Sequence, residues 1–166
     1  MIAILLNDAS FEQDIRELLM AFYPGETFTH KEEEAGEADL IVRGVRDGNS
    51  FSLDVTPVKK DAVHFALIYP DFSNRFETKN EIKQTLYRLL SAQTGRELPW
   101  GTLTGIRPTK IALTKLYDGW TDEQIETYMR ETYFTSKEKI DLSIDVAERE
   151  RRLLSTIDYE NGYSLY

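Results

Sequence analysis

Apolar and polar positions near the start of the chain follow first a strand-like and then a helical pattern. Residues 1–6 form an apolar run that stops at Asn7, which predicts a short buried strand. Apolar residues then recur at helical spacing over 11–22, and Ser10 with Gln13 fits a capping box at the start of that stretch. The pattern therefore predicts a strand followed by an amphipathic helix.

The next part of the chain changes to a strand-like composition. Residues 27–30 are compatible with a short strand, and the charged run at 31–39 predicts a solvated acidic loop. Gly48 lies in an Asp-Gly-Asn break and accepts the positive φ angle of a hairpin turn, so its neighbouring strands are expected to be antiparallel. The segments rich in branched and aromatic residues are 40–45, 51–58 and 63–69.

From about residue 78 the pattern is helical almost to the end of the chain. Gly95 and Gly119 end the first two apolar stripes, and Pro108 suits the first turn of the second helix because its missing N–H costs nothing there. Two further stripes follow. Capping boxes are predicted at Thr78 with Glu81, Thr121 with Gln124 and Thr135 with Glu138.

Together these elements predict an α+β fold, with a small mainly antiparallel sheet, covering helices and a compact helical subdomain after it. The final Gly-Tyr-Ser-Leu-Tyr has the character of a strand. Because natural termini usually fray into polar residues, this apolar stop is expected of an excised segment. The predicted divisions are an α+β layer at 1–95, a connecting loop at 96–107, the helical subdomain at 108–158 and the start of a strand at 159–166.

Charge and composition narrow the possible partners. A net charge of -9 repels phosphate backbones, so no nucleic acid partner is expected, and the acidic last helices count against a helix-turn-helix. No apolar run approaches the roughly 18 to 20 residues of a membrane span, and the start of the chain lacks the features of a signal peptide. A cytoplasmic location is expected.

The chain offers few groups for catalysis. It has no cysteine, so it provides no thiolate for a nucleophile, an iron-sulfur cluster or a zinc site, and its two histidines, His30 and His64, stand apart in the sequence. Neither a G-x-S-x-G nor a G-x-x-x-x-G-K-[ST] string is present, which counts against an independent hydrolase or transferase. No catalytic residue, metal ligand or cofactor is predicted in this chain.

The most unusual stretch is LPWGTLTGIRPTK at 98–110, within the predicted connection. Its glycines allow close backbone approach, its tryptophan offers a stacking face, and Arg107 presents a fork suited to a carboxylate beside the free N–H groups of a helix start. A structural alternative stays open, in which the tryptophan fills the seam between the two layers and Arg107 pairs with an acid. The candidate binding residues are Trp100, Gly101, Thr104, Gly105, Arg107 and Lys110.

This stretch, preceded by LLSAQTG and followed by SKEK and the segment 145–154, resembles the front region of HemZ-type proteins. These proteins are similar to oxygen-independent coproporphyrinogen III oxidases. The resemblance is strongest over 86–166. It implies that the strand at 159–166 leads into a radical SAM barrel, absent here, whose three-cysteine motif binds a 4Fe-4S cluster and S-adenosylmethionine.

The resemblance also implies a task in heme biosynthesis. The parent reaction would be the oxidative decarboxylation of two propionates of coproporphyrinogen III, with the barrel as partner and the porphyrinogen as substrate. This chain alone is not expected to catalyse it, and the six candidate residues would bind substrate or contact the barrel. The alternative is a protein-interaction or regulatory module of a radical SAM protein with another heme-related task.

Overall fold

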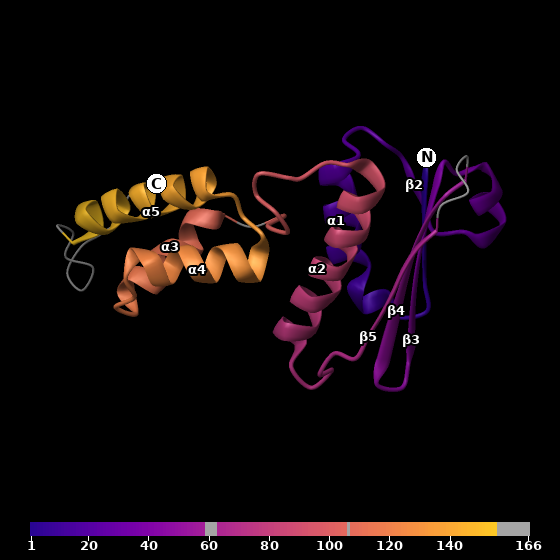
Figure 1. The fold of residues 1–166 in the computed structure, drawn as a ribbon, viewed down its shortest axis with the longest axis horizontal. Coiled ribbons are helices and arrows are strands. Elements are labelled where there is room, and N and C mark those ends of the chain that lie inside the picture. The colour runs from indigo at the N-terminus through magenta and orange to yellow at the C-terminus, as the bar shows by residue number, and fades with distance from the viewer. Residues whose placement is uncertain (59–62, 106, 156–166) are drawn as a thin grey trace, which may run out of the picture.

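The computed structural model of the protein describes residues 1–58, 63–105 and 107–155. These residues form a five-stranded sheet, helices against one of its faces, and a group of three helices beside this layer (Figure 1). The strands are β1 (Ile2–Leu6), β2 (Phe28–Thr29), β3 (Leu40–Asp47), β4 (Ser50–Pro57) and β5 (His64–Ile68). The helices are α1 (Glu12–Phe22), α2 (Arg75–Thr94), α3 (Pro108–Tyr117), α4 (Asp122–Tyr133) and α5 (Lys137–Leu154), with short 3-10 helices η1 (Ala9–Phe11) and η2 (Glu32–Glu37).

The strand order is β2-β1-β3-β4-β5. Strand β1 is parallel to both of its neighbours, whereas β3, β4 and β5 form an antiparallel meander whose first turn has Gly48 at a φ of 56°. The predicted α+β class and the mainly antiparallel sheet are confirmed. The predicted strand at 159–166 lies outside the described residues.

The first core lies between the sheet and the helices α1 and α2. Paired residues such as Ile4 and Val42, or Val42 and Val55, point to the same face because partners across a ladder share a side of the sheet. The buried members of this core include Ile2, Phe11, Ile15, Leu18, Leu19, Phe22, Phe51, Leu53, Ile82, Leu86 and Leu90. Figure 1 shows α1 and α2 between the sheet and the three later helices.

The acidic segment at 31–39 is not the solvated loop that its charge predicts. Residues Glu32–Glu37 form η2, and Ala35 and Ala38 are buried against Ala3 and Leu5 on the other face of the sheet. The glutamates face solvent while the two alanines pack. The two alanines within this acidic run therefore cover part of this face of the sheet.

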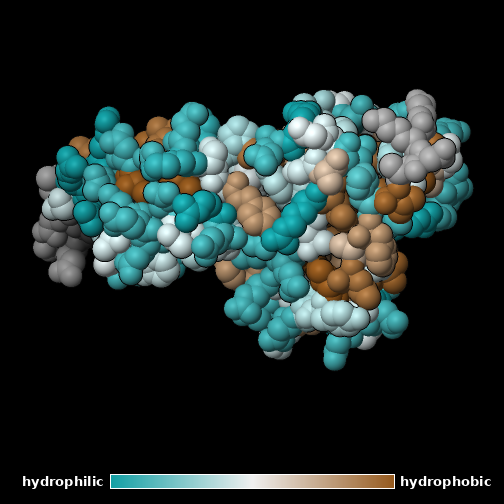
Figure 2. Space-filling view, in the orientation of Figure 1, coloured by the Kyte–Doolittle hydropathy of each residue, from teal (hydrophilic) through white to brown (hydrophobic). Residues whose placement is uncertain are grey.

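The rest of that sheet face is open along the edge strand β5. The side chains of Phe65 and Leu67 keep 60% and 47% of their surface exposed, and Val63 just before the strand keeps 62%. Figure 2 shows apolar side chains gathered over the sheet layer. Such a row on an unpaired edge strand is uncommon in proteins, because edges of this kind pair readily with other chains.

The second core belongs to α3, α4 and α5. Ile125 and Met129 of α4, Ala112 of α3 and Ile140 of α5 are fully buried in it. Residues 118–121 and 134–136 make the short connections between these helices. The division of the chain at 96–107 stays a prediction, although each layer has its own apolar cluster.

Only one of the four predicted capping boxes forms. Thr121 and Gln124 cap α4 reciprocally, as expected. Before α1, Asp8 caps the 3-10 helix η1 instead, and its carboxylate accepts from the Ser10 N–H. The cap of α2 is Asn74, four residues before the predicted Thr78, and its side chain accepts from the Glu77 N–H. The fifth helix begins after Ser136, which makes no side-chain cap hydrogen bond.

Candidate functional site

The loop that joins the two layers is fixed to the corner between α4 and α5. Gly101 has a left-handed φ of 58°, and a Cβ atom placed there would lie 1.9 Å from the carbonyl oxygen of Tyr133. The Thr102 N–H donates to that same oxygen at 2.7 Å, and Ser136 N–H donates to the Pro99 carbonyl at 2.9 Å. Only glycine permits this close approach of two backbones.

Trp100 packs at the edge of the helical core. Its half-buried ring lies against the cluster of α3, α4 and α5, and the Lys139 ammonium sits 5.8 Å from the ring centroid. The tryptophan therefore contributes to packing in the described residues. In the structural alternative the ring fills the seam between the two layers. The ring does fill space, but it packs within the helical layer.

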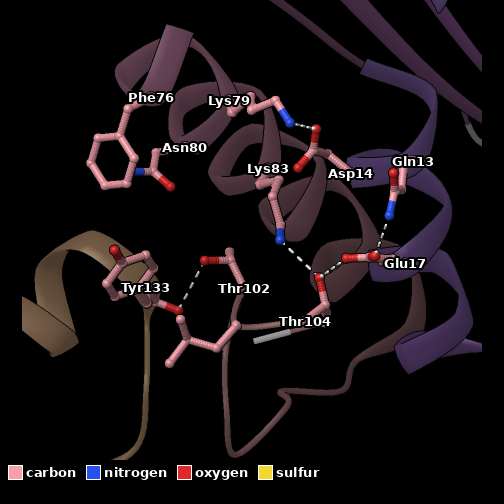
Figure 3. Close-up of a pocket in the computed structure, with 12 residues that line it drawn as sticks. Gln13, Asp14, Glu17, Phe76, Lys79, Asn80, Lys83, Thr102, Thr104 and Tyr133 are labelled. Carbon is pink, nitrogen blue, oxygen red and sulfur yellow. Dashed lines mark hydrogen bonds and ion pairs between the residues drawn. The ribbon is translucent and has the colours of Figure 1, made fainter. Parts of the chain in front are cut away.

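A cleft of about 320 Å³ opens where this loop meets the sheet layer (Figure 3). Helix α1 contributes polar side chains to one wall, α2 contributes two lysines to another, and the loop and the end of α4 close the remaining sides. Tyr133 faces this cleft, and burial raises the pKa of its phenol well above its ordinary value. The principal polar residues lining the cleft are Asp14, Glu17, Lys79, Lys83 and Thr104.

A chain of polar contacts crosses the cleft from helix to loop. Lys83 Nζ donates to Thr104 Oγ1 at 2.8 Å, and Thr104 Oγ1 donates to Glu17 Oε2 at 3.3 Å. Alongside, Lys79 Nζ pairs with Asp14 Oδ2 at 2.6 Å. The dashed lines of Figure 3 trace these contacts from α2 through the loop to α1.

Lys83 is the least exposed charged group of the cleft, with 9% of its surface accessible. Its burial lowers the pKa of the ammonium, and the nearby carboxylates of Asp14 and Glu17 oppose that shift. A buried lysine with defined acidic partners in a cleft is a feature of functional sites and also of structural ion-pair networks. Here the ammonium donates to Thr104 of the connecting loop, which favours a role in positioning that loop.

The six predicted residues do not form one cluster. Thr104 and Gly105 line the cleft, and a Cβ atom at Gly105 would lie 2.7 Å from Glu17 Oε2, so the glycine lets the loop approach α1. Arg107 and Lys110 lie at the start of α3 with exposed side chains, outside the residues that line the cleft. Gly101 and Trp100 belong to the contact with α4 and α5 described above.

Arg107 pairs with an acid, as the structural alternative proposed. Its Nη2 lies 3.3 Å from Glu150 Oε1, and the arginine side chain keeps 64% of its surface exposed. Exposed ion pairs of this kind contribute little to stability and exchange partners readily. The guanidinium is thus accessible to another carboxylate.

Sequence reasoning missed the helical half of the cleft. Lys79 and Lys83 are four positions apart and share one face of α2, while Asp14 and Glu17 are three apart on α1. Lys83 directly follows the buried Ile82 and precedes the buried Thr85 and Leu86, so a lysine within an apolar helix stretch was the available signal. This signal could identify Lys83 as a buried lysine, but it could not predict that the lysine contacts the connecting loop.

The arrangement can bind and orient, but the described residues assemble no group of three or more metal-ligating side chains. The two lysines and two carboxylates of the cleft balance in formal charge, so the cleft does not select strongly for an anion or a cation. Its polar chain holds the connecting loop against the sheet layer. No helix in the described parts of the chain is long and apolar enough to cross a membrane.

Comparison with known proteins identifies one relevant similarity. Over 90 residues, the chain is 36% identical to the oxygen-independent coproporphyrinogen-III oxidase-like protein HemZ of Bacillus subtilis (strain 168). No family model matches the chain, and no solved structure matches it. The aligned region covers 52% of this chain and 18% of the relative. The resemblance expected from the sequence is confirmed, and it is a similarity to a minor part of a much longer HemZ protein.

Proposed function

We propose that this chain is an accessory N-terminal region of an oxygen-independent coproporphyrinogen-III oxidase-like enzyme of heme biosynthesis, acting in the cytoplasm. The observation that carries the proposal is the 36% identity to a protein of that description. In the proposed enzyme the chemistry belongs to a radical SAM barrel in another part of the polypeptide. With no cysteine, the residues of this chain do not fit a 4Fe-4S cluster, so no catalytic step is assigned to them.

The open face of β5 supports packing against the rest of the enzyme. Phe65 and Leu67 form an exposed apolar row on an edge strand, and Val63 extends it. Covering such a row removes apolar surface from water, which favours association. In this proposal the barrel supplies the cover.

The connecting loop is proposed to help shape the substrate site. Arg107 and Lys110 are exposed cations at the beginning of α3, and Arg107 pairs with Glu150 at the surface. A porphyrinogen bears carboxylates, for which an arginine fork and a helix start are suitable partners. The contacts of Lys83 and Thr104 would hold the loop in place while Arg107 meets the substrate.

Replacing Arg107 in a full-length enzyme tests this role. Arg107→Gln should weaken binding of the porphyrinogen about tenfold, as expected for the loss of one charge-assisted hydrogen bond. Arg149→Gln is the matched control, because Arg149 is also an exposed arginine in an ion pair, with Asp145. Equal substrate affinity in the two variants would remove Arg107 from the substrate site.

Hydrogen exchange tests the packing on the barrel. The amides of β5 should exchange more slowly in the full-length enzyme than in the 166-residue chain, because a covered edge is shielded from water. The amides of α4, which take no part in the proposed contact, serve as the internal reference. Unchanged exchange in β5 would contradict barrel packing and would favour an interaction or regulatory module instead.

A further inference from the structure

A second cavity, of about 460 Å³, lies on the seam between α2 and the corner of α4 and α5. It is lined by rings and by groups of opposite charge, and it is separate from the cleft of Lys83. Its volume falls within the range of about 300 to 1,000 Å³ that small-molecule sites occupy. The residues that define its chemistry are Tyr87, Arg88, Ser91, Glu97, Arg130 and Phe134.

The apolar wall of the cavity is made of two aromatic rings. The centroids of Tyr87 and Phe134 lie 5.5 Å apart at an angle of 52°. Phe134 takes a left-handed φ of 58° as the C-cap of α4, a conformation that glycine or asparagine usually adopts. The fold therefore holds a bulky ring at this corner despite its unfavourable backbone, which fixes the position of the wall.

Two guanidinium groups supply positive charge at the same cavity. Arg88 is exposed, and its guanidinium lies 4.9 Å from the Phe134 ring centroid. Arg130 forms an ion pair with Glu126, with 3.1 Å between Nη1 and Oε1, and more than half of the arginine side chain is exposed. Both arginines can donate to a carboxylate without first breaking a buried ion pair.

Ser91 provides a hydroxyl that the described protein atoms leave without a partner. Its Oγ atom is buried and makes no hydrogen bond. A buried polar atom in this state is unfavourable unless something else satisfies it. Rotation of the Ser91 side chain about its Cα–Cβ bond would turn this hydroxyl toward a ligand oxygen in the cavity, which Ser91 lines.

We infer that this cavity binds a small monocarboxylate with a flat apolar body. The carboxylate lies between Arg88 and Arg130 and accepts from Ser91, while the apolar body contacts Phe134 and Tyr87. Glu97 places one negative charge on the same wall, and Glu126 already partly neutralises Arg130 from outside the lining, so at most one positive unit is left for a ligand. A single carboxylate matches that charge, whereas a polyanion would be repelled by Glu97.

The test is a titration of the 166-residue chain with 2-naphthoate, followed by amide chemical shifts. We expect saturable shifts at Ser91 and Phe134. Arg88→Gln should weaken binding at least fivefold, and Ser91→Ala should weaken it without affecting folding, since its hydroxyl bonds to no described protein atom. The control Arg149→Gln removes an exposed arginine of α5 and should leave affinity unchanged.

A neutral ligand of the same shape separates charge recognition from apolar binding. 2-Naphthamide should bind at least tenfold more weakly than 2-naphthoate. Equal binding of the two ligands, shifts confined to the exposed row of β5, or no binding at millimolar concentration would each overturn the inference. Thermal unfolding of each variant verifies that a loss of binding does not come from a loss of the fold.

Discussion

Close contact between Gly101 and the carbonyl of Tyr133 leaves no room for a side chain in the connecting loop. The space that a methyl group would need is occupied by backbone atoms of Tyr133 and Phe134, which cannot rotate away as a side chain can. The loop and the corner of α4 and α5 must therefore shift together if anything is added there. This contact makes Gly101 a structural requirement at the site.

Substitution of this glycine should be costly. Gly101→Ala is expected to lower the free energy of unfolding by about 3 kcal/mol or more, because strain at positive φ adds to a backbone clash. The control is Gly119→Ala, where φ is 80° and no atom lies within 4 Å of the added carbon. That change should cost only about 1 kcal/mol. Urea unfolding of the two variants measures both, and equal losses would contradict the clash.

Burial of Lys83 predicts a pH dependence of stability. The folded chain holds the pKa of this ammonium below its ordinary value of 10.5. Between the folded pKa and 10.5, the unfolded chain binds more protons on this group, so the free energy of unfolding rises with pH in that window. Relative to Lys83→Met, the wild-type chain should therefore gain stability as the pH is raised toward 10.5.

Urea unfolding at a series of alkaline pH values measures that difference. Thr104→Val is the control, because it removes the hydroxyl that Lys83 contacts and keeps the lysine. It should retain the pH dependence of the wild-type chain. A wild-type chain whose stability runs parallel to that of Lys83→Met at every pH would show that the lysine is not desolvated.

At the scale of the helix, the start of α2 separates a real cap from an apparent one. Thr78 with Glu81 has the spacing of a capping box, yet the helix already begins at Arg75 and Thr78 is buried, donating to the Asp71 carbonyl at 2.7 Å. The cap is Asn74. Spacing alone cannot distinguish the two, because both place a short polar side chain before an apolar stripe.

Two alanine substitutions should resolve the caps by stability. Asn74→Ala is expected to cost about 1 kcal/mol, since it leaves the Glu77 N–H without its acceptor. Glu81→Ala should stay within about 0.5 kcal/mol, as for surface changes that touch no cap or core contact. Thermal unfolding compares the stability of the two variants. A larger loss of stability from Glu81→Ala would favour the predicted capping box of Thr78 and Glu81.

At the scale of the whole molecule, the sequence predicts local elements better than their assembly. The sequence predicts the strands at 40–45 and 51–58 because one face of each is buried and the turn at Gly48 joins them directly. The parallel pairing of β1 with β3 could not be found, because residues far apart in the chain meet there and leave no local pattern. The same limit hid the cleft, where Lys83 meets Thr104 across the seam.

The candidate residues of the loop illustrate the same limit. The sequence predicts close approach at Gly101 and Gly105 because the absence of a side chain is visible in it, and both glycines do lie against neighbouring atoms. What they approach was not visible. Arg107 was assigned a carboxylate partner by its chemistry alone, and the partner in the structure, Glu150, lies on a helix that the sequence could not orient.

The short connections within α3, α4 and α5 have a consequence for the order in which the chain acquires its structure. Helices joined through 118–121 and 134–136 meet close neighbours, whereas β1 must find β3 across an intervening helix and strand. Local contacts close faster than distant ones. During refolding, helices α3, α4 and α5 should therefore collapse first, and the sheet should complete its pairing later although its strands precede these helices in the chain.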